Sequence, residues 1–279
     1  MLSRKLTGRV CPLNIPLPPD DEKGWKPYPT FHGFTAGLQN LSCHVSVLNK
    51  DCCPHSPHTH NEEEILVLLH GKVELILSDT HSKSAQRRIP LKAREFVYYP
   101  SQFAHTLQTV SKEPANYLML KWQNDKKESD SSLAFGRFSA IDCGEDSDVE
   151  EGFRTRLVFQ GPTTYLRKLH CHTSILTPGS GYDSHIDTYD VAIIVMEGEV
   201  ETLGDRAGPY SVIFYPAGES HGMYNPRDEV AKYIVFEFHC KQKGLTGVRL
   251  KSLLSYLIKA KDPRRWKRKL KKLFADCNK

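Results

Sequence analysis

The chain has 279 residues, of which 39% are hydrophobic and 25% charged, a composition typical of globular proteins with a substantial buried core. No stretch approaches the roughly 18 consecutive apolar residues of a membrane-spanning helix, which argues against an integral membrane protein of that type. The first residues lack the apolar core of a secretory signal, so we expect a cytoplasmic protein.

The sequence contains one block twice, and a chain of this length is typical of two domains. The segments 41–48 and 169–176 share the pattern Leu-x-Cys-His-x-Ser-x-Leu, 128 residues apart. Apolar runs around Gly71 and Gly198 follow, 127 residues apart. Short segments rich in Val, Ile, Tyr and Phe between turn residues indicate strands. The pattern therefore predicts a tandem duplication of one all-β unit.

Five segments are predicted along the chain. Residues 1–34 form an N-terminal arm, and residues 35–123 form the first β unit. Residues 124–151 are polar, acidic at their end and poor in aliphatic side chains, which favours a linker. The second β unit covers residues 152–241, and residues 242–279 form a C-terminal tail.

Four side chains of the first unit are predicted to converge on a metal ion. His58, His60 and Glu64 are separated by even numbers of residues, so on a β-strand all three lie on one face. This arrangement requires a bend near Asn61, because strict alternation would also turn the side chain of Glu62 inward. His105, at the end of an apolar segment in the other half of the unit, supplies the fourth ligand.

The spacing of these residues resembles the two sequence motifs of the cupin family. The first motif is matched throughout by His58-x-His60-x3-Glu64-x6-Gly71. The second is matched at its proline and its ligand histidine, with substitutions at two turn positions, Gln102 and Thr109. The resemblance implies an all-β fold of two tandem cupin barrels, each a double-stranded β-helix or jelly roll, with a short basic helical extension at the C-terminus.

The second unit carries a complete second motif but an altered first motif. The complete motif consists of Pro216, Gly218, His221 and Asn225. In the first motif His185 is kept, Asp187 replaces the second histidine and Val191 replaces the glutamate. We expect a degenerate barrel that packs, dimerises or binds a small ligand. A metal site of His185, Asp187 and His221 is left open, because two imidazoles and one carboxylate can bind a metal ion.

The basic residues are concentrated in the tail. The net charge is +5 overall and +6 in residues 262–279, so the rest of the chain carries about −1, which argues against a nucleic-acid cleft across the domains. An apolar stripe from Trp266 to Phe274 predicts a basic amphipathic helix. The helix either packs on its own barrel or, as we slightly favour, binds an anionic membrane surface or an acidic partner.

The cupin resemblance implies metal binding but does not fix the reaction, because this fold carries many activities. Three imidazoles and one carboxylate leave coordination positions for water, O2 or substrate, and they suit one divalent transition metal: Fe, Mn, Ni or Zn. Our leading hypothesis is a metal-dependent, dioxygenase-type oxidoreductase that acts on a small polar organic substrate. The alternatives are a lyase or sugar isomerase or epimerase, and a non-catalytic protein that binds a small ligand. A homodimer is also left open.

Overall fold

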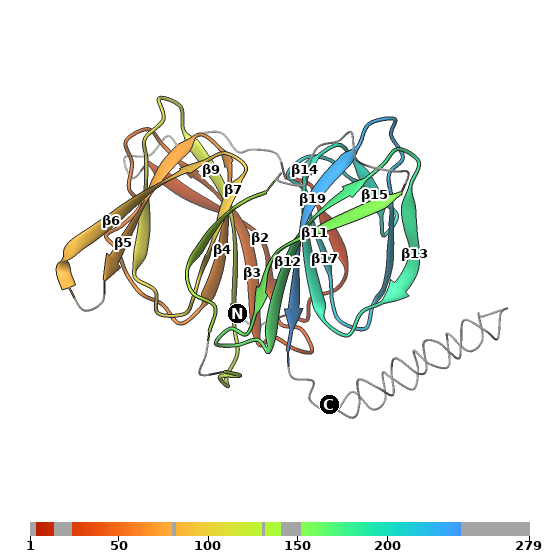
Figure 1. Ribbon diagram of the computed structural model, residues 1–279, viewed down its shortest axis with the longest axis horizontal. Helices are drawn as coiled ribbons and strands as arrows, with labels where there is room; N and C mark the ends of the chain where they lie inside the picture. The colour runs from red at the N-terminus through yellow and green to blue at the C-terminus, as the bar shows by residue number, and fades with distance from the viewer. Residues whose placement is uncertain (1–3, 14–23, 80–81, 130–131, 141–151, 241–279) are drawn as a thin grey trace. The chain divides into compact units, whose positions relative to one another are not determined.

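The computed structural model describes residues 4–13, 24–79, 82–129, 132–140 and 152–240 (Figure 1). Within these residues every helix or strand assigned is a β-strand, so the predicted all-β class is confirmed. No helix long and apolar enough to cross a membrane is found in this part of the chain. The predicted basic helix of the tail lies outside the described residues.

The first barrel, barrel 1, combines a six-stranded sheet with a three-stranded sheet. The large sheet has the order β10-β7-β4-β9-β3-β2 and the small sheet has the order β6-β5-β8. Neighbouring strands pair in the antiparallel direction. The strands are β2 (Trp25–Gly33), β3 (Asn40–Leu48), β4 (Glu63–His70), β5 (Lys72–Asp79), β6 (Ser82–Lys92), β7 (Glu95–Tyr99), β8 (His105–Thr109), β9 (Ala115–Gln123) and β10 (Gly136–Ser139).

Barrel 2 repeats this plan. Its large sheet has the order β1-β17-β14-β19-β12-β11, and its small sheet has the order β13-β18-β15-β16. Position by position, β14, β19 and β12 correspond to β4, β9 and β3. The strands are β1 (Arg9–Cys11), β11 (Phe153–Gly161), β12 (Lys168–Leu176), β13 (Gly181–Ile186), β14 (Asp190–Glu197), β15 (Val200–Thr202), β16 (Asp205–Ala207), β17 (Val212–Tyr215), β18 (Ser220–Tyr224) and β19 (Ala231–His239).

Strand β4 is apolar along most of its length because both of its faces are buried. Ile65 and Val67 belong to a core that also contains residues of barrel 2, whereas Leu66 and Leu68 belong to the interior of barrel 1. Strand β14 divides its residues in the same way between the shared core and the interior of barrel 2. A strand buried on both sides reads as a continuous hydrophobic run, which explains the two apolar runs seen in the sequence.

Strands also occur in the segments that the sequence analysis assigned to an arm and a linker. In the arm, β1 pairs with β17 of barrel 2, and β2 pairs with β3 of barrel 1. In the linker, β10 pairs with β7. These three strands extend the large sheets through backbone hydrogen bonds. Backbone pairing does not require a marked hydrophobic pattern, so the sequence pattern does not reveal these strands. The sequence boundaries therefore understate how much of the chain lies in the sheets.

Two buried acids join the barrels in a reciprocal manner. The Thr163 hydroxyl of the second half donates to Glu63 Oε2 at 2.7 Å, and the Thr35 hydroxyl of the first half donates to Asp190 Oδ2 at 2.6 Å. Asp190 points away from the interior of barrel 2, because it alternates with the inward-facing Val191. Barrel 1 covers it and leaves it 1% exposed.

Candidate metal centre

The four predicted ligands of barrel 1 come from two regions of the chain. Glu64 is the second residue of β4 and His105 the first residue of β8. His58 lies outside the named strands and forms an isolated antiparallel bridge with His105. The chain bends at residues 61 and 62 before β4 begins, which confirms the predicted bend. The expectation that the first three ligands share one strand was wrong: only Glu64 lies on β4.

The structure brings these four side chains together. His60 Nε2 lies 2.9 Å from Glu64 Oε1, and His105 Nε2 lies 2.8 Å from Glu64 Oε2. Ligand atoms of these three residues lie within 4.8 Å of one another and could hold a metal ion. The His58 ring sits slightly farther out, with its centroid 5.5 Å from that of His60 and 6.0 Å from that of His105.

Backbone contacts aim two of the imidazoles at Glu64. The Nδ1 atom of His60 lies 3.0 Å from the carbonyl oxygen of Glu62, and that of His105 lies 2.8 Å from the carbonyl oxygen of Phe103. A carbonyl oxygen can only accept, so these contacts favour the tautomer with a proton on Nδ1 and a lone pair on Nε2. Such partners fix the orientation of a metal-ligating histidine.

Glu64 is fully buried and negatively charged. Burial alone would raise its pKa, but the contacts with the neighbouring imidazoles and the charge of Lys121 outweigh it and hold the pKa well below the usual value. Lys121 lies directly opposite Glu64 on β9 and forms an ion pair with it. Both carboxylate oxygens and His60 Nε2 are buried, and their close contacts lack hydrogen-bond geometry. Buried polar atoms of this kind require a partner.

A cavity of about 500 Å³ opens onto this cluster. It is lined by Glu64, His58, His105 and Lys121, together with apolar side chains that include Leu66 and Met119. His44 also lines the cavity, and burial with the charge of Lys121 lowers its pKa to about 4. Tyr99 is the tyrosine of the Tyr98–Tyr99 pair that faces the barrel interior, where it stacks on His105.

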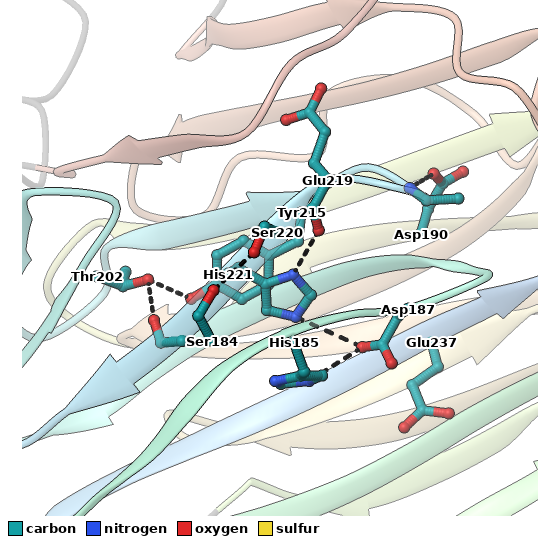
Figure 2. A network of polar contacts seen from close by, with 12 residues as sticks. Ser184, His185, Asp187, Asp190, Thr202, Tyr215, Glu219, Ser220, His221 and Glu237 are labelled. Carbon is teal, nitrogen blue, oxygen red and sulfur yellow. Dashed lines mark hydrogen bonds and ion pairs between the residues drawn. The ribbon is translucent and has the colours of Figure 1, made fainter. Parts of the chain in front are cut away.

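In barrel 2 three of the four corresponding positions still carry possible ligands. Figure 2 shows Asp187 between two imidazoles: its Oδ2 atom lies 3.5 Å from His185 Nε2 and 3.4 Å from His221 Nε2. These contacts lower the pKa of Asp187 even though burial acts to raise it. Val191 is buried in the apolar interior of the barrel and offers no ligand atom. The structure therefore brings His185, Asp187 and His221 together, but the fourth motif position offers no ligand.

Sequence reasoning missed two features. Lys121 was not connected with Glu64, because the register of β9 against β4 cannot be read from local spacing. A further group, His170, His172 and Glu237, also has ligand atoms within 4.8 Å of one another. His172 and His44 occupy equivalent positions of the two repeats, and a duplicated residue is as readily structural as functional, so the repeat does not mark His172 as a ligand. The alternating His-x-His and Glu-x-His spacing in two strands was the available signal.

The comparisons with known proteins agree with this architecture. The family described as Cupin matches residues 38–143, whereas no curated protein matches the chain by sequence. A putative glyoxylate-induced protein from Pseudomonas aeruginosa has a similar structure, with a TM-score of 0.61 and 12% identity, covering 86% of this chain and 91% of its own. A Cupin 2 conserved barrel domain protein from Leptotrichia buccalis is also similar, with a TM-score of 0.55 and 11% identity, covering 79% of this chain and 91% of its own.

A mutant form of an oxalate decarboxylase from Bacillus subtilis is also similar, with a TM-score of 0.52 and 12% identity over 74% of this chain and 70% of that one. At these identities the likeness concerns the fold alone. The family match over residues 38–143, the jelly-roll barrels and their paired arrangement together support a cupin-superfamily protein with two barrels.

Proposed function

We propose that barrel 1 holds one divalent transition metal through His58, His60, Glu64 and His105, and that the protein is a metal-dependent enzyme acting on a small carboxylate-bearing molecule. One observation carries the proposal. Two imidazoles contact a fully buried carboxylate, the ring of His58 lies beside them, and buried ligand atoms of the cluster lack partners with hydrogen-bond geometry. Neutral imidazoles and an ionised carboxylate are the protonation states that a divalent ion requires.

The donor set fits such an ion. Nitrogen and carboxylate donors suit Fe, Mn, Ni or Zn in their divalent states, and four protein ligands leave positions of an octahedron for substrate. When bound, the metal supplies Lewis-acid character and, if it is iron, a site for O2. The chain's own contribution is to aim the imidazoles through backbone carbonyls and to exclude water with the buried wall behind Glu64.

The cavity supports an anionic substrate. Its volume of about 500 Å³ lies within the usual range for small-molecule sites. Lys121 places a positive charge on the wall beside Glu64, and its side chain is 27% exposed. Other parts of the lining, among them Leu66 and Met119, are apolar. A carboxylate could therefore pair with Lys121 while an adjacent oxygen faces the cluster.

Within this proposal we place dioxygenase-type oxidation first, because a metal with four protein ligands would leave room for both substrate and O2. A lyase reaction is the second candidate. The similar Bacillus subtilis structures are oxalate decarboxylases, one of which is described with Mn(II) centres, and oxalate is a small dicarboxylate. Oxygen dependence separates the two reactions.

The test is turnover of a panel of small hydroxy acids, keto acids, dicarboxylates and neutral sugars by metal-loaded protein, with and without O2. We expect consumption of an anionic substrate that is abolished by Glu64→Gln and by His60→Ala. Lys121→Met should raise KM for the anionic substrate much more than for a neutral analogue. His70→Ala is the matched control, because His70 is an exposed histidine at the end of β4. Turnover that survives both ligand substitutions would overturn the proposal.

A further inference from the structure

A second group of possible ligands lies on β12 and β19, away from the duplicated motif positions. His170 and His172 alternate on β12 with Leu169 and Cys171, which face the shared core. The two imidazoles consequently face the interior of barrel 2. Glu237 lies directly opposite His170 on β19, and the three residues offer ligand atoms within 4.8 Å of one another.

The two barrels differ in chemistry along one cross-strand row. In barrel 1 the row reads Ser42, Lys121 and Glu64 on β3, β9 and β4, and in barrel 2 it reads His170, Glu237 and Val191 on β12, β19 and β14. The row in barrel 2 thus also contains a carboxylate, but it lies on β19, the counterpart of β9, and not on β14, the counterpart of β4. It also gains an imidazole where barrel 1 has a hydroxyl. The neighbouring row adds His172.

Contacts with nearby side chains orient this group as a metal site requires. His170 Nδ1 lies 3.0 Å from Gln160 Oε1, which favours a proton on Nδ1 and a lone pair on Nε2. His239 Nε2 lies 2.7 Å from Glu237 Oε2, and Glu237 Oε1 faces His172 Nδ1 at 4.0 Å. An outer histidine that fixes a ligating carboxylate in this way is typical of metal sites.

One nitrogen of this group is buried without a partner. His172 Nδ1 has no hydrogen-bond partner among the described residues. A buried polar atom of this kind requires a partner, and a metal ion held between His170, His172 and Glu237 would supply it.

We propose that His170, His172 and Glu237 bind a second divalent cation of borderline softness such as Zn²⁺, with His239 positioning Glu237. Two imidazoles and one carboxylate are a known zinc donor set that leaves a position for water. This site is independent of the cluster in barrel 1. It also differs from the set of His185, Asp187 and His221, which occupies the motif positions of barrel 2.

The test titrates metal-stripped full-length protein with Co²⁺, following the visible absorption of bound Co²⁺ and the number of tightly bound equivalents. All variants are made in a His60→Ala background, which removes the candidate centre of barrel 1 and makes the result independent of it. We expect the background protein to bind one equivalent that Zn²⁺ displaces. His172→Ala and Glu237→Gln should each abolish it, while His239→Ala should weaken it about 10–100-fold. His70→Ala is the control and should change nothing.

Circular dichroism of the metal-free variants checks folding. Should His172→Ala fail to fold, the near-isosteric Glu237→Gln still tests the proposal. Two results would overturn the proposal. The first is a background protein that binds no Co²⁺ tightly. The second is an equivalent of bound Co²⁺ that persists in His172→Ala and Glu237→Gln. If only His221→Ala removed that Co²⁺, the ion would lie at the motif positions of barrel 2, which would also overturn the proposal.

Discussion

His105 in barrel 1 and His221 in barrel 2 occupy the same position, each stacked on a tyrosine with ring centroids 3.9 Å apart. The acids around them differ. Glu64 contacts His105 from β4, whereas Asp187 contacts His221 from the loop that follows β13. The comparison teaches that duplication has retained the scaffold of the site, a histidine held against an aromatic ring, while the charged groups have been redistributed.

The acids between the barrels differ in a similar way. Glu63 accepts four hydrogen bonds, from the side chains of Tyr98, Trp122 and Thr163 and from the Thr164 backbone. Its counterpart Asp190 accepts two, from Thr35 and from the backbone of Ala217. Burial raises the pKa of both, in Asp190 to about 6. Each half of the interface thus contains a buried acid at the same position, but Glu63 accepts more hydrogen bonds than Asp190.

The largest expected effect breaks this interface. Glu63→Ala leaves several buried donors without an acceptor, at about 1–3 kcal/mol each, so we expect the unfolding free energy to fall by about 4 kcal/mol. Asp190→Ala should cost about half as much. Urea denaturation of the metal-free proteins measures both, and Glu63→Gln, which keeps one acceptor oxygen, should give an intermediate value. An equal or greater loss in Asp190→Ala would contradict the proposed asymmetry.

The next effect is the pH dependence that Asp190 adds. Its pKa is about 6 in the folded protein against 3.8 for the unperturbed group, so the folded state holds the proton more tightly. The stabilisation is complete below about pH 3.8 and is lost as the pH rises to about 6, at most about 3 kcal/mol. The difference in unfolding free energy between wild type and Asp190→Asn should change by this amount from pH 4 to 7. A constant difference would contradict it.

A smaller effect concerns the tyrosine behind His221. The Tyr215 hydroxyl lies 2.7 Å from the Thr202 hydroxyl, and both side chains are buried. Tyr215→Phe keeps the stacked ring but removes this hydrogen bond, so we expect a loss of about 1 kcal/mol in thermal or urea unfolding. Thr202→Val should cost more, because the Thr202 hydroxyl also donates to the carbonyl oxygen of Gly222 at 2.6 Å, and the double variant should cost less than the sum. Full additivity would show that the two hydroxyls do not depend on each other.

The sequence predicts part of this arrangement because some of the determinants are local. The spacing of His58, His60 and Glu64 within one short segment was sufficient to predict that they converge. The positions of Lys121 and Glu237 depend on how distant strands pair, and no local pattern specifies that register. The burial of Asp190 is not local either: alternation shows that its side chain faces away from its own barrel, but not that a second barrel covers it.

The most direct test of the central claim is an anomalous difference map from crystals of the full-length protein grown with Mn²⁺ or Zn²⁺. The account predicts a peak in barrel 1 within about 2.0–2.3 Å of Glu64 and the three histidines, distances typical of such bonds. The same crystals of Glu64→Gln should show a much weaker peak at lower metal concentration. A metal-loaded crystal with no peak within bonding distance of Glu64, or with its strongest peak elsewhere in the barrel, would contradict the account.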